Sequence, residues 1–494
     1  MKKSCAVIGS GIAGLAAAIR IASKGNAVDV YETNNYPGGK MKELNKEGFR
    51  FDMGPSIFML PNLVDELFEI CNKNPRDYFS YSSLEIPFKY FFEDGLVINA
   101  YSDVERYGRE IESKTKDSKL AFDNYRKDIE TKYKITNEVF IENSLHVATN
   151  FINRRTVNGL RNFHKIGAFK SMNDGNKSFF KDPHLVQLLN SYAAYIGSNP
   201  FVAPATLNVI QHLEINLGSY IPEKGIYSIV KALVKLAEDM GVKFYYNTTV
   251  EEIIITPQTG LKNKKVTGIK TNNSGVKNYD RVISNMDIYY TFKKLLPNEK
   301  QPERILNQPK SSSVISFFWG INKKFEDLAI HNMLFSADDE GEFKSIFEEK
   351  TVTDDPTIYI SISSKHIKED APEGCENWFL FITVSNDQGQ NWDELTKLAR
   401  KNIISKINRI LKTDIEKYIV FEDYMTPPMI EKNYSSPFGA VYGNSSNDKF
   451  ASFFRHSNFS KKIKGLYFVG GSVHPGAGIP MCLNSAKIME KVFS

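Results

Sequence analysis

Cysteine is scarce in this 494-residue chain, and none of it is spaced as a metal site requires. Cys5, Cys71, Cys375 and Cys482 include no Cys-x-x-Cys pair and have no histidine at ligand spacing. Zinc and iron–sulfur sites are therefore not expected. Four scattered thiols in a chain of this size are typical of reduced, mostly buried cysteines, so we expect a cytoplasmic location and no metal.

Long apolar runs and a large excess of charge are also missing. No stretch reaches the roughly 18 to 20 apolar residues that would span a bilayer. Lys2 and Lys3 precede an apolar stretch at residues 5–19, but Arg20 follows without a cleavage site, which argues against a secretory signal. The 63 basic and 58 acidic residues leave a net charge of only +5. This balance does not support a nucleic-acid partner.

Side-chain sets for acid–base or nucleophilic catalysis are not recognisable either. The chain has no nucleophile elbow, no Cys–His pair at a known spacing and no carboxylate dyad. His474 is more simply explained as a structural histidine than as a catalytic one, and Glu214 is equally ambiguous. No catalytic residue is assigned, which suits a reaction performed by a bound cofactor.

Residues 3–32 have the pattern of a dinucleotide-binding unit. The sequence predicts a buried strand over residues 3–8, a helix over 15–23 and a second strand over 28–31 that ends at Glu32. Gly9 permits the tight turn, Gly11 lets a pyrophosphate approach the backbone, and Gly14 lets the helix pack on the strand. Glu32 is expected to accept hydrogen bonds from the adenosine ribose. The pyrophosphate is expected at the helix N-terminus, beside Ile12 and Ala13.

Two further segments show a family resemblance. A Gly38-Gly39-Lys40 turn and Asp52-Met53-Gly54-Pro55-Ser56 are similar to segments of FAD-binding amine oxidases and carotenoid desaturases. Near the other end, a strand over residues 465–471 runs into His474-Pro475-Gly476-Ala477-Gly478-Ile479-Pro480 and then a helix over 481–492. This run closely resembles the C-terminal motif of bacterial phytoene-desaturase-type carotenoid desaturases. Weaker similarity at residues 195–200, 218–225, 282–287 and 454–458 extends the resemblance over nearly the whole chain.

The resemblance implies FAD as cofactor and an α/β fold. That fold has a Rossmann-type FAD-binding domain of the amine-oxidase and carotenoid-desaturase type, a mixed α+β substrate domain and a helical region. The implied cofactor-binding residues are Gly9, Gly11, Ile12, Ala13, Gly14, Glu32, Gly39, Lys40, Gly54, Pro55, Ser56, Val250, Asn285, Met286, Gly470, Gly471, Gly478, Ile479 and Pro480. We expect the FAD-binding domain at residues 1–72, 218–287 and 460–494. The substrate domain is expected at 73–140 and 288–459, and the helical region at 141–217.

The implied activity is removal of a hydride and a proton from a C–C bond next to a polyene. Val473 and Met481 replace smaller or more polar residues of the family, and bulk beside the flavin would shorten a substrate tunnel. This favours 3,4-desaturation of a 1′-hydroxylated carotenoid. The alternatives are multi-step phytoene desaturation, an amine or protoporphyrinogen oxidase, and a flavin-containing carrier without catalytic activity. Oxygen and a membrane quinone are both open as electron acceptors.

A basic and aromatic segment at residues 151–181 suggests peripheral contact with the inner membrane. It contains Arg154, Arg155, Arg161, Lys165, Lys170, Lys177 and Lys181 against the single acid Asp174, with Phe151, Phe163, Phe169, Phe179 and Phe180 among them. Interleaved basic and aromatic residues suit an anionic bilayer surface. The alternative is a solvated face with ordinary core aromatics.

Overall fold

A five-stranded parallel sheet joins the two ends of the chain. The computed structural model describes residues 2–151, 162–258, 264–448 and 455–493. The strands stand in the order β20-β13-β1-β2-β9, and every neighbouring pair is parallel. Their bounds are β1 Ser4–Ile8, β2 Ala27–Tyr31, β9 Lys243–Tyr245, β13 Arg281–Ser284 and β20 Leu466–Phe468. The Rossmann-type unit predicted from residues 3–32 is thus confirmed.

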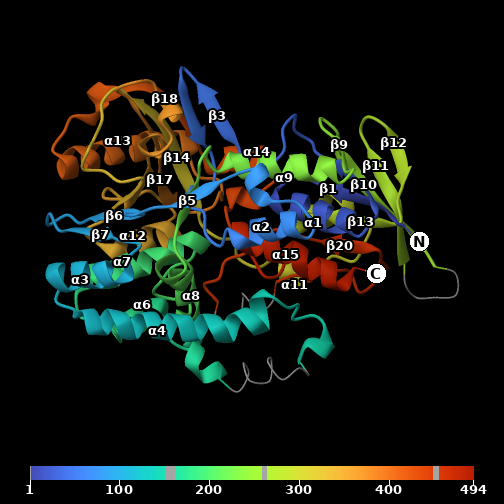
Figure 1. Cartoon of the computed structure of the whole chain (residues 1–494), viewed down its shortest axis with the longest axis horizontal. Coiled ribbons are helices and arrows are strands. Elements are labelled where there is room, and N and C mark those ends of the chain that lie inside the picture. The colour runs from blue at the N-terminus through green and yellow to red at the C-terminus, as the bar shows by residue number, and fades with distance from the viewer. Residues whose placement is uncertain (1, 152–161, 259–263, 449–454, 494) are drawn as a thin grey trace.

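Both faces of this sheet are covered, which explains its continuous apolar runs. On one face, α1 (Ile12–Ser23) packs between α9 (Tyr227–Asp239) and α15 (Ile479–Val492). The other face packs on a small sheet of β10 (Val250–Pro257), β11 (Lys264–Thr271) and β12 (Gly275–Asn278), with β19 (Ile463–Lys464) pairing β11. Both chain ends lie beside the parallel sheet (Figure 1).

The chain changes sheets between β9 and β10. These strands are separated only by residues 246–249, yet they belong to different sheets. Asn247 between them has a φ of +50°, a left-handed conformation that turns the chain out of one sheet and into the next. Asn tolerates this conformation better than most residues, so the break carries a sequence cue.

A seven-stranded mixed sheet forms the other half of the molecule (Figure 1). Its order is β18-β14-β17-β16-β15-β6-β7, with bounds β6 Phe88–Phe91, β7 Val97–Ala100, β14 Ser313–Ile321, β15 His331–Leu334, β16 Ile358–Ser361, β17 Glu376–Val384 and β18 Ile419–Met425. The long helix α13 (Trp392–Leu411) packs on one face of this sheet. An aromatic core lies on the other face, beneath α3 (Val104–Lys114), α4 (Lys119–Thr136), α6 (Met172–Lys177) and α7 (Pro183–Asn190).

The remaining elements connect these parts. They are the hairpin β3 (Glu43–Lys46) and β4 (Phe49–Asp52), the pair β5 (Tyr81–Ser83) and β8 (Tyr220–Pro222), and the helices α2 (Asn62–Glu69), α8 (Val209–Gln211), α10 (Ile288–Tyr290), α11 (Glu303–Leu306), α12 (Asp339–Lys344) and α14 (Pro427–Tyr434). The architecture is the expected α/β fold with a mixed α+β part and a helical part. All five parallel strands fall within residues 1–72, 218–287 and 460–494; the exact domain boundaries stay a prediction. In the described part of the chain, no helix has the length and apolarity needed to cross a membrane.

Candidate cofactor and substrate site

The predicted cofactor residues converge on one edge of the parallel sheet. Gly9 follows β1, Glu32 follows β2, Asn285 follows β13 and Gly470 comes shortly after β20. Because the strands are parallel, their carboxyl ends lie at the same edge, where ligands of open α/β sheets bind. The N-terminus of α15 reaches the same place, since Gly471 packs against Ala477 just before that helix.

The first glycine turn has the close packing that the sequence predicts. Gly9 has a φ of +92°, and a Cβ placed on Gly14 would lie 2.2 Å from the Gly9 carbonyl oxygen. A Cβ on Gly11 would lie 2.8 Å from Nδ2 of Asn285. Any side chain at these positions would displace either the turn or Asn285, so the helix N-terminus stays open to a ligand.

Asn285 joins turns that are far apart in the sequence. Its Nδ2 lies 3.4 Å from the Gly9 carbonyl oxygen, and its Oδ1 would lie 3.1 Å from a Cβ on Gly470, whose φ is +115°. The Gly470 N–H donates to Ser485 Oγ at 3.1 Å, which ties this loop to α15. Asn285 was assigned to the site from the sequence only by family resemblance. Its contacts with both glycine turns are visible only in the structure.

Glu32 lies against the same turn, with only 7% of its surface exposed. Its carboxylate accepts hydrogen bonds from the Ser10 N–H at 2.9 Å, from Ser10 Oγ at 2.7 Å and from the Asn34 N–H at 2.9 Å. The backbone beside Glu32 is bonded to Thr248, whose N–H donates to the Glu32 carbonyl at 2.9 Å. This contact brings Val250, the first residue of β10, towards Glu32.

Lys40 is held inside the molecule by backbone on two sides. The Gly38 N–H donates to the Ser10 carbonyl at 3.0 Å, and a Cβ on Gly54 would lie 2.0 Å from the Lys40 carbonyl oxygen. Lys40 Nζ donates to the Val441 carbonyl at 2.7 Å. Burial lowers the pKa of Lys40, and the nearby Asp287 carboxylate opposes that shift.

Positive charge exceeds negative charge around this edge. Burial raises the pKa of Asp287, while Lys310 and Lys40 act in the opposite direction. Arg455 is buried without an acidic partner among the described residues, and burial lowers its pKa to about 10. Its Nε has no hydrogen-bond partner there, and its Nη1 reaches the Gly471 carbonyl only at 3.4 Å. Burying an unpaired guanidinium is costly, so this environment favours an anionic ligand.

The N-terminus of α15 is open towards this edge. Gly478 precedes the helix with a φ of +103°, and no atom lies within 4 Å of a Cβ placed on it. The helix begins at Ile479, two residues earlier than predicted, with Pro480 in its first turn. Free N–H groups at the start of a 14-residue helix favour negative charge.

Val473 differs from what was expected of the flavin surroundings, whereas the contacts of the nearby His474 agree with the structural role favoured from the sequence. Val473 is buried in the apolar cluster behind the parallel sheet, where it packs with Ile8 and Phe468. It exposes only 1% of its surface, so the expectation that Val473 narrows a tunnel is wrong. His474 is also buried, its Nε2 lies 2.9 Å from the Asn143 carbonyl, and burial lowers its pKa to about 4. A structural histidine fits these contacts.

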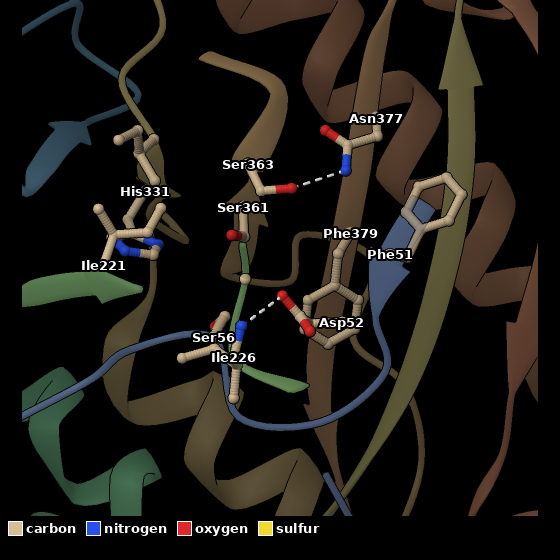
Figure 2. Close-up of a pocket in the computed structure, with 12 residues that line it drawn as sticks. Phe51, Asp52, Ser56, Ile221, Ile226, His331, Ser361, Ser363, Asn377 and Phe379 are labelled. Atoms are coloured by element: carbon tan, nitrogen blue, oxygen red, sulfur yellow. Dashed lines mark hydrogen bonds between the residues drawn. The ribbon is translucent and has the colours of Figure 1, made fainter. Parts of the chain in front are cut away.

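The segment 52–56 connects the two halves of the molecule. Asp52 accepts a hydrogen bond from the Ile226 N–H at 2.9 Å, just before α9 (Figure 2). It also accepts one from the Tyr227 N–H at 3.0 Å. Ser56 Oγ lies 2.6 Å from the Tyr359 hydroxyl on β16. A cavity of about 20 Å³ between them is lined by Asp52, Ser56 and His331. It has room for about one water molecule and not for a polyene.

The basic and aromatic segment is only partly described. Arg154, Arg155 and Arg161 lie outside the described residues, and the side chains of Phe151 and Phe163 are not described. Phe169 is 70% exposed, and Lys165, Lys170, Lys177 and Lys181 are exposed as well. Phe180 is buried beside Tyr125, so it belongs to the aromatic core. Among the described residues, no three His, Cys, Asp or Glu side chains gather as metal ligands.

Residues 12–488 match the flavin containing amine oxidoreductase family. A 1-hydroxycarotenoid 3,4-desaturase of Flavobacterium sp. (strain P99-3) is 44% identical over 99% of this chain and 98% of its own length. A 4,4'-diaponeurosporene oxygenase of Staphylococcus aureus (strain MSSA476) is 32% identical over 100% of this chain and 98% of its own. The structure of an oxidoreductase from Methanosarcina mazei superposes with a TM-score of 0.62 at 15% identity, covering 98% of both chains. The chain therefore belongs to the flavin-containing amine oxidoreductase family, within it to the carotenoid desaturases, and is an FAD-dependent oxidoreductase.

Proposed function

We propose that this enzyme introduces the 3,4 double bond into a carotenoid that is hydroxylated at the neighbouring end. The observation that carries the proposal is the 44% identity, along almost the entire chain, to a 1-hydroxycarotenoid 3,4-desaturase. The small cavity beside Asp52 is unsuited to a polyene, so the substrate is assigned to the region between the cofactor edge and the aromatic core, where the hydride acceptor would be within reach.

The residues at the sheet edge fit FAD, and we assign them to it. Glu32 would hold the adenosine ribose, with the backbone of Val250 beside the adenine. Residues 9–14 would hold the pyrophosphate, and Gly39, Lys40, residues 54–56, Asn285, Met286, Gly470, Gly471 and residues 478–480 would surround the rest. The close glycine turns and the orphaned Arg455 Nε support this assignment. Bound FAD supplies the acceptor for the hydride that leaves the substrate.

Residues of the protein position the substrate and set the electrostatic potential at the cofactor edge. Lys40, Arg455 and the α15 N-terminus provide positive potential at the cofactor edge. The partly buried residues Tyr195 and Phe381, backed by the aromatic core, would exclude water from a carbocation. These contributions fit an enzyme without a dedicated nucleophile.

We further propose that the enzyme works at the cytoplasmic surface of the inner membrane and passes electrons to oxygen or a membrane quinone. A carotenoid dissolves in lipid, and Phe169 with Lys165 and Lys170 forms an exposed basic and aromatic patch. Such patches bind anionic bilayers through combined apolar and electrostatic contact.

Product analysis tests the proposed reaction. The FAD-loaded protein would be incubated with vesicles that contain either a 1′-hydroxylated carotenoid or phytoene, and the products identified by absorption spectra. We expect the hydroxylated carotenoid to gain one conjugated double bond. Formation of neurosporene or lycopene from phytoene, with the hydroxylated carotenoid unchanged, would instead support multi-step phytoene desaturation.

A further inference from the structure

Glu214 is a buried carboxyl group held by two tyrosines in the helical turn His212–Asn216. Its Oε1 accepts a hydrogen bond from the Tyr192 hydroxyl at 2.5 Å, and its Oε2 accepts one from the Tyr195 hydroxyl at 2.9 Å. The two tyrosine rings stack with their centroids 5.1 Å apart. No lysine or arginine of the described chain forms an ion pair with Glu214. The two tyrosine hydroxyls are therefore the groups that hold this buried carboxyl.

Tyr195 is the member of this cluster that presents surface to its surroundings. Glu214 and Tyr192 are buried, whereas Tyr195 is partly exposed and packs on the aromatic core together with Ile57 and Phe381. Burial raises the pKa of Tyr195 well above its ordinary value, and the Glu214 carboxylate adds to that rise. The hydroxyl donates its proton to Glu214, which leaves its oxygen lone pairs free to accept another.

Tyr195 lies beside the aromatic core, close in the chain to residues that pack near Lys40. Ile57 follows Ser56, whose hydroxyl is bonded to Tyr359, and the Tyr359 and Phe381 rings lie 4.8 Å apart. On the other side, a Cβ on Gly197 would lie 3.0 Å from the Tyr442 ring. Tyr442 is the neighbour of Val441, whose carbonyl holds Lys40. Tyr195 thus packs on the aromatic core, and Gly197, two residues further along the chain, lies beside the neighbour of the residue that holds Lys40.

We propose that Tyr195 and Glu214 form a relay that accepts the proton released during desaturation. This inference rests on the proposed function. After the hydride has left with two electrons for FAD, a C–H bond next to the cationic carbon breaks, and its electron pair forms the new C=C bond. The proton passes to the Tyr195 oxygen while the Tyr195 hydroxyl proton moves to the Glu214 carboxylate. The substrate has then lost one hydride and one proton, and Glu214 is a neutral acid.

Glu214 has the acid–base character that this step needs. Burial raises its pKa to about 7, and the two tyrosine hydrogen bonds oppose that rise. A base with a pKa near the working pH is efficient in proton transfer. The relay needs the ionised form of Glu214, so product formation should fall as the pH falls through about 7.

The variants Glu214→Gln and Tyr195→Phe test the relay in the FAD-loaded enzyme. Mixed anaerobically with carotenoid in vesicles, the wild type should bleach its flavin and form the longer polyene together. In Glu214→Gln the flavin should still bleach, while polyene formation should slow about 100-fold and lose its inflection near pH 7. Tyr195→Phe should behave similarly, and it keeps the experiment decisive if Glu214→Gln does not fold.

Glu342→Gln is the matched control. Glu342 is also buried with a pKa raised to about 7, but its hydrogen bonds come from Thr357. This variant should keep both rates, and infrared spectra should lose one carboxylic C=O band in each glutamine variant. Unchanged polyene formation and pH profile in both relay variants would overturn the relay. A wild type whose flavin no carotenoid reduces would instead overturn the proposed function, while the infrared titration of Glu214 would still report its ionisation.

Discussion

Glu32 is the side chain through which the adenosine end of FAD is expected to bind. Its carboxylate also accepts hydrogen bonds from Ser10, so Glu32 stabilises the glycine turn at residues 9–14. Replacement by alanine removes charge-assisted hydrogen bonds worth about 1.5 to 3 kcal/mol, which corresponds to roughly 10- to 100-fold weaker binding. We predict that Glu32→Ala loses FAD on dilution, measured by the flavin-to-protein ratio. Exposed Glu69→Ala is the control, and full FAD retention by Glu32→Ala would refute the assignment.

Glu214 also predicts how stability depends on pH. Burial raises its pKa from 4.5 to about 7, so the folded state binds this proton more tightly than the unfolded state does. The resulting stability is fully present below about pH 4.5 and is lost as the pH rises through about 7, by at most about 3 kcal/mol. The melting temperature of Glu214→Gln minus that of the wild type should therefore be larger at pH 8 than at pH 5. If that difference in melting temperature is smaller at pH 8 than at pH 5, the raised pKa of Glu214 is contradicted.

At the residue scale the sequence was informative where a side chain acts locally. The tasks of Gly9 and Gly14 follow from a turn contained within six residues, and the structure confirms the tight turn and the close packing. The position of Val473 depends on which face of the chain turns inward after β20, and the sequence-based expectation was wrong. Arg455 has no acidic side chain as an ion-pair partner in the described part of the chain. Only the three-dimensional fold shows this, because the sequence does not tell which residues surround Arg455.

Helix α1 is the element whose placement matters most for the cofactor. A Cβ on Gly14 would overlap the Gly9 backbone, whereas a Cβ on Gly11 would meet the Asn285 side chain, which has more freedom to move. Gly14→Ala should therefore lose FAD and lower the melting temperature more than Gly11→Ala does. Differential scanning calorimetry of both variants, with flavin content, measures the difference. Equal flavin content and equal melting temperatures in the two variants would show that α1 shifts easily on the sheet.

Elements with a strong local pattern were predicted well, and those defined by long-range pairing were not. The strands β1 and β2 lie within one residue of the prediction, and the helix α1 begins three residues earlier than predicted. The separation of β9 from β10 is not visible in the apolar pattern, because the turn at Asn247 is what assigns them to different sheets. The pairing of β5 with β8 joins residues about 140 positions apart, and no local pattern indicates it.

The whole molecule presents its proposed membrane patch on the helical part, away from the small β10–β12 sheet (Figure 1). Phe169 is 70% exposed among exposed lysines, while Val276 on β12 is 59% exposed and serves as a matched control. Phe169→Ser should reduce flotation with anionic vesicles at low salt, and Val276→Ser should not. If the wild type remains in the soluble fraction under these conditions, peripheral binding through this patch is wrong.

Anaerobic titration of the FAD-loaded enzyme tests the central claim most directly. The protein would be mixed with increasing amounts of a 1′-hydroxylated carotenoid in vesicles, and flavin bleaching compared with the number of new double bonds. The account predicts one reduced flavin for each double bond formed, since each desaturation transfers one hydride. A flavin that remains oxidised with every carotenoid, but is reduced by a polyamine, would contradict it.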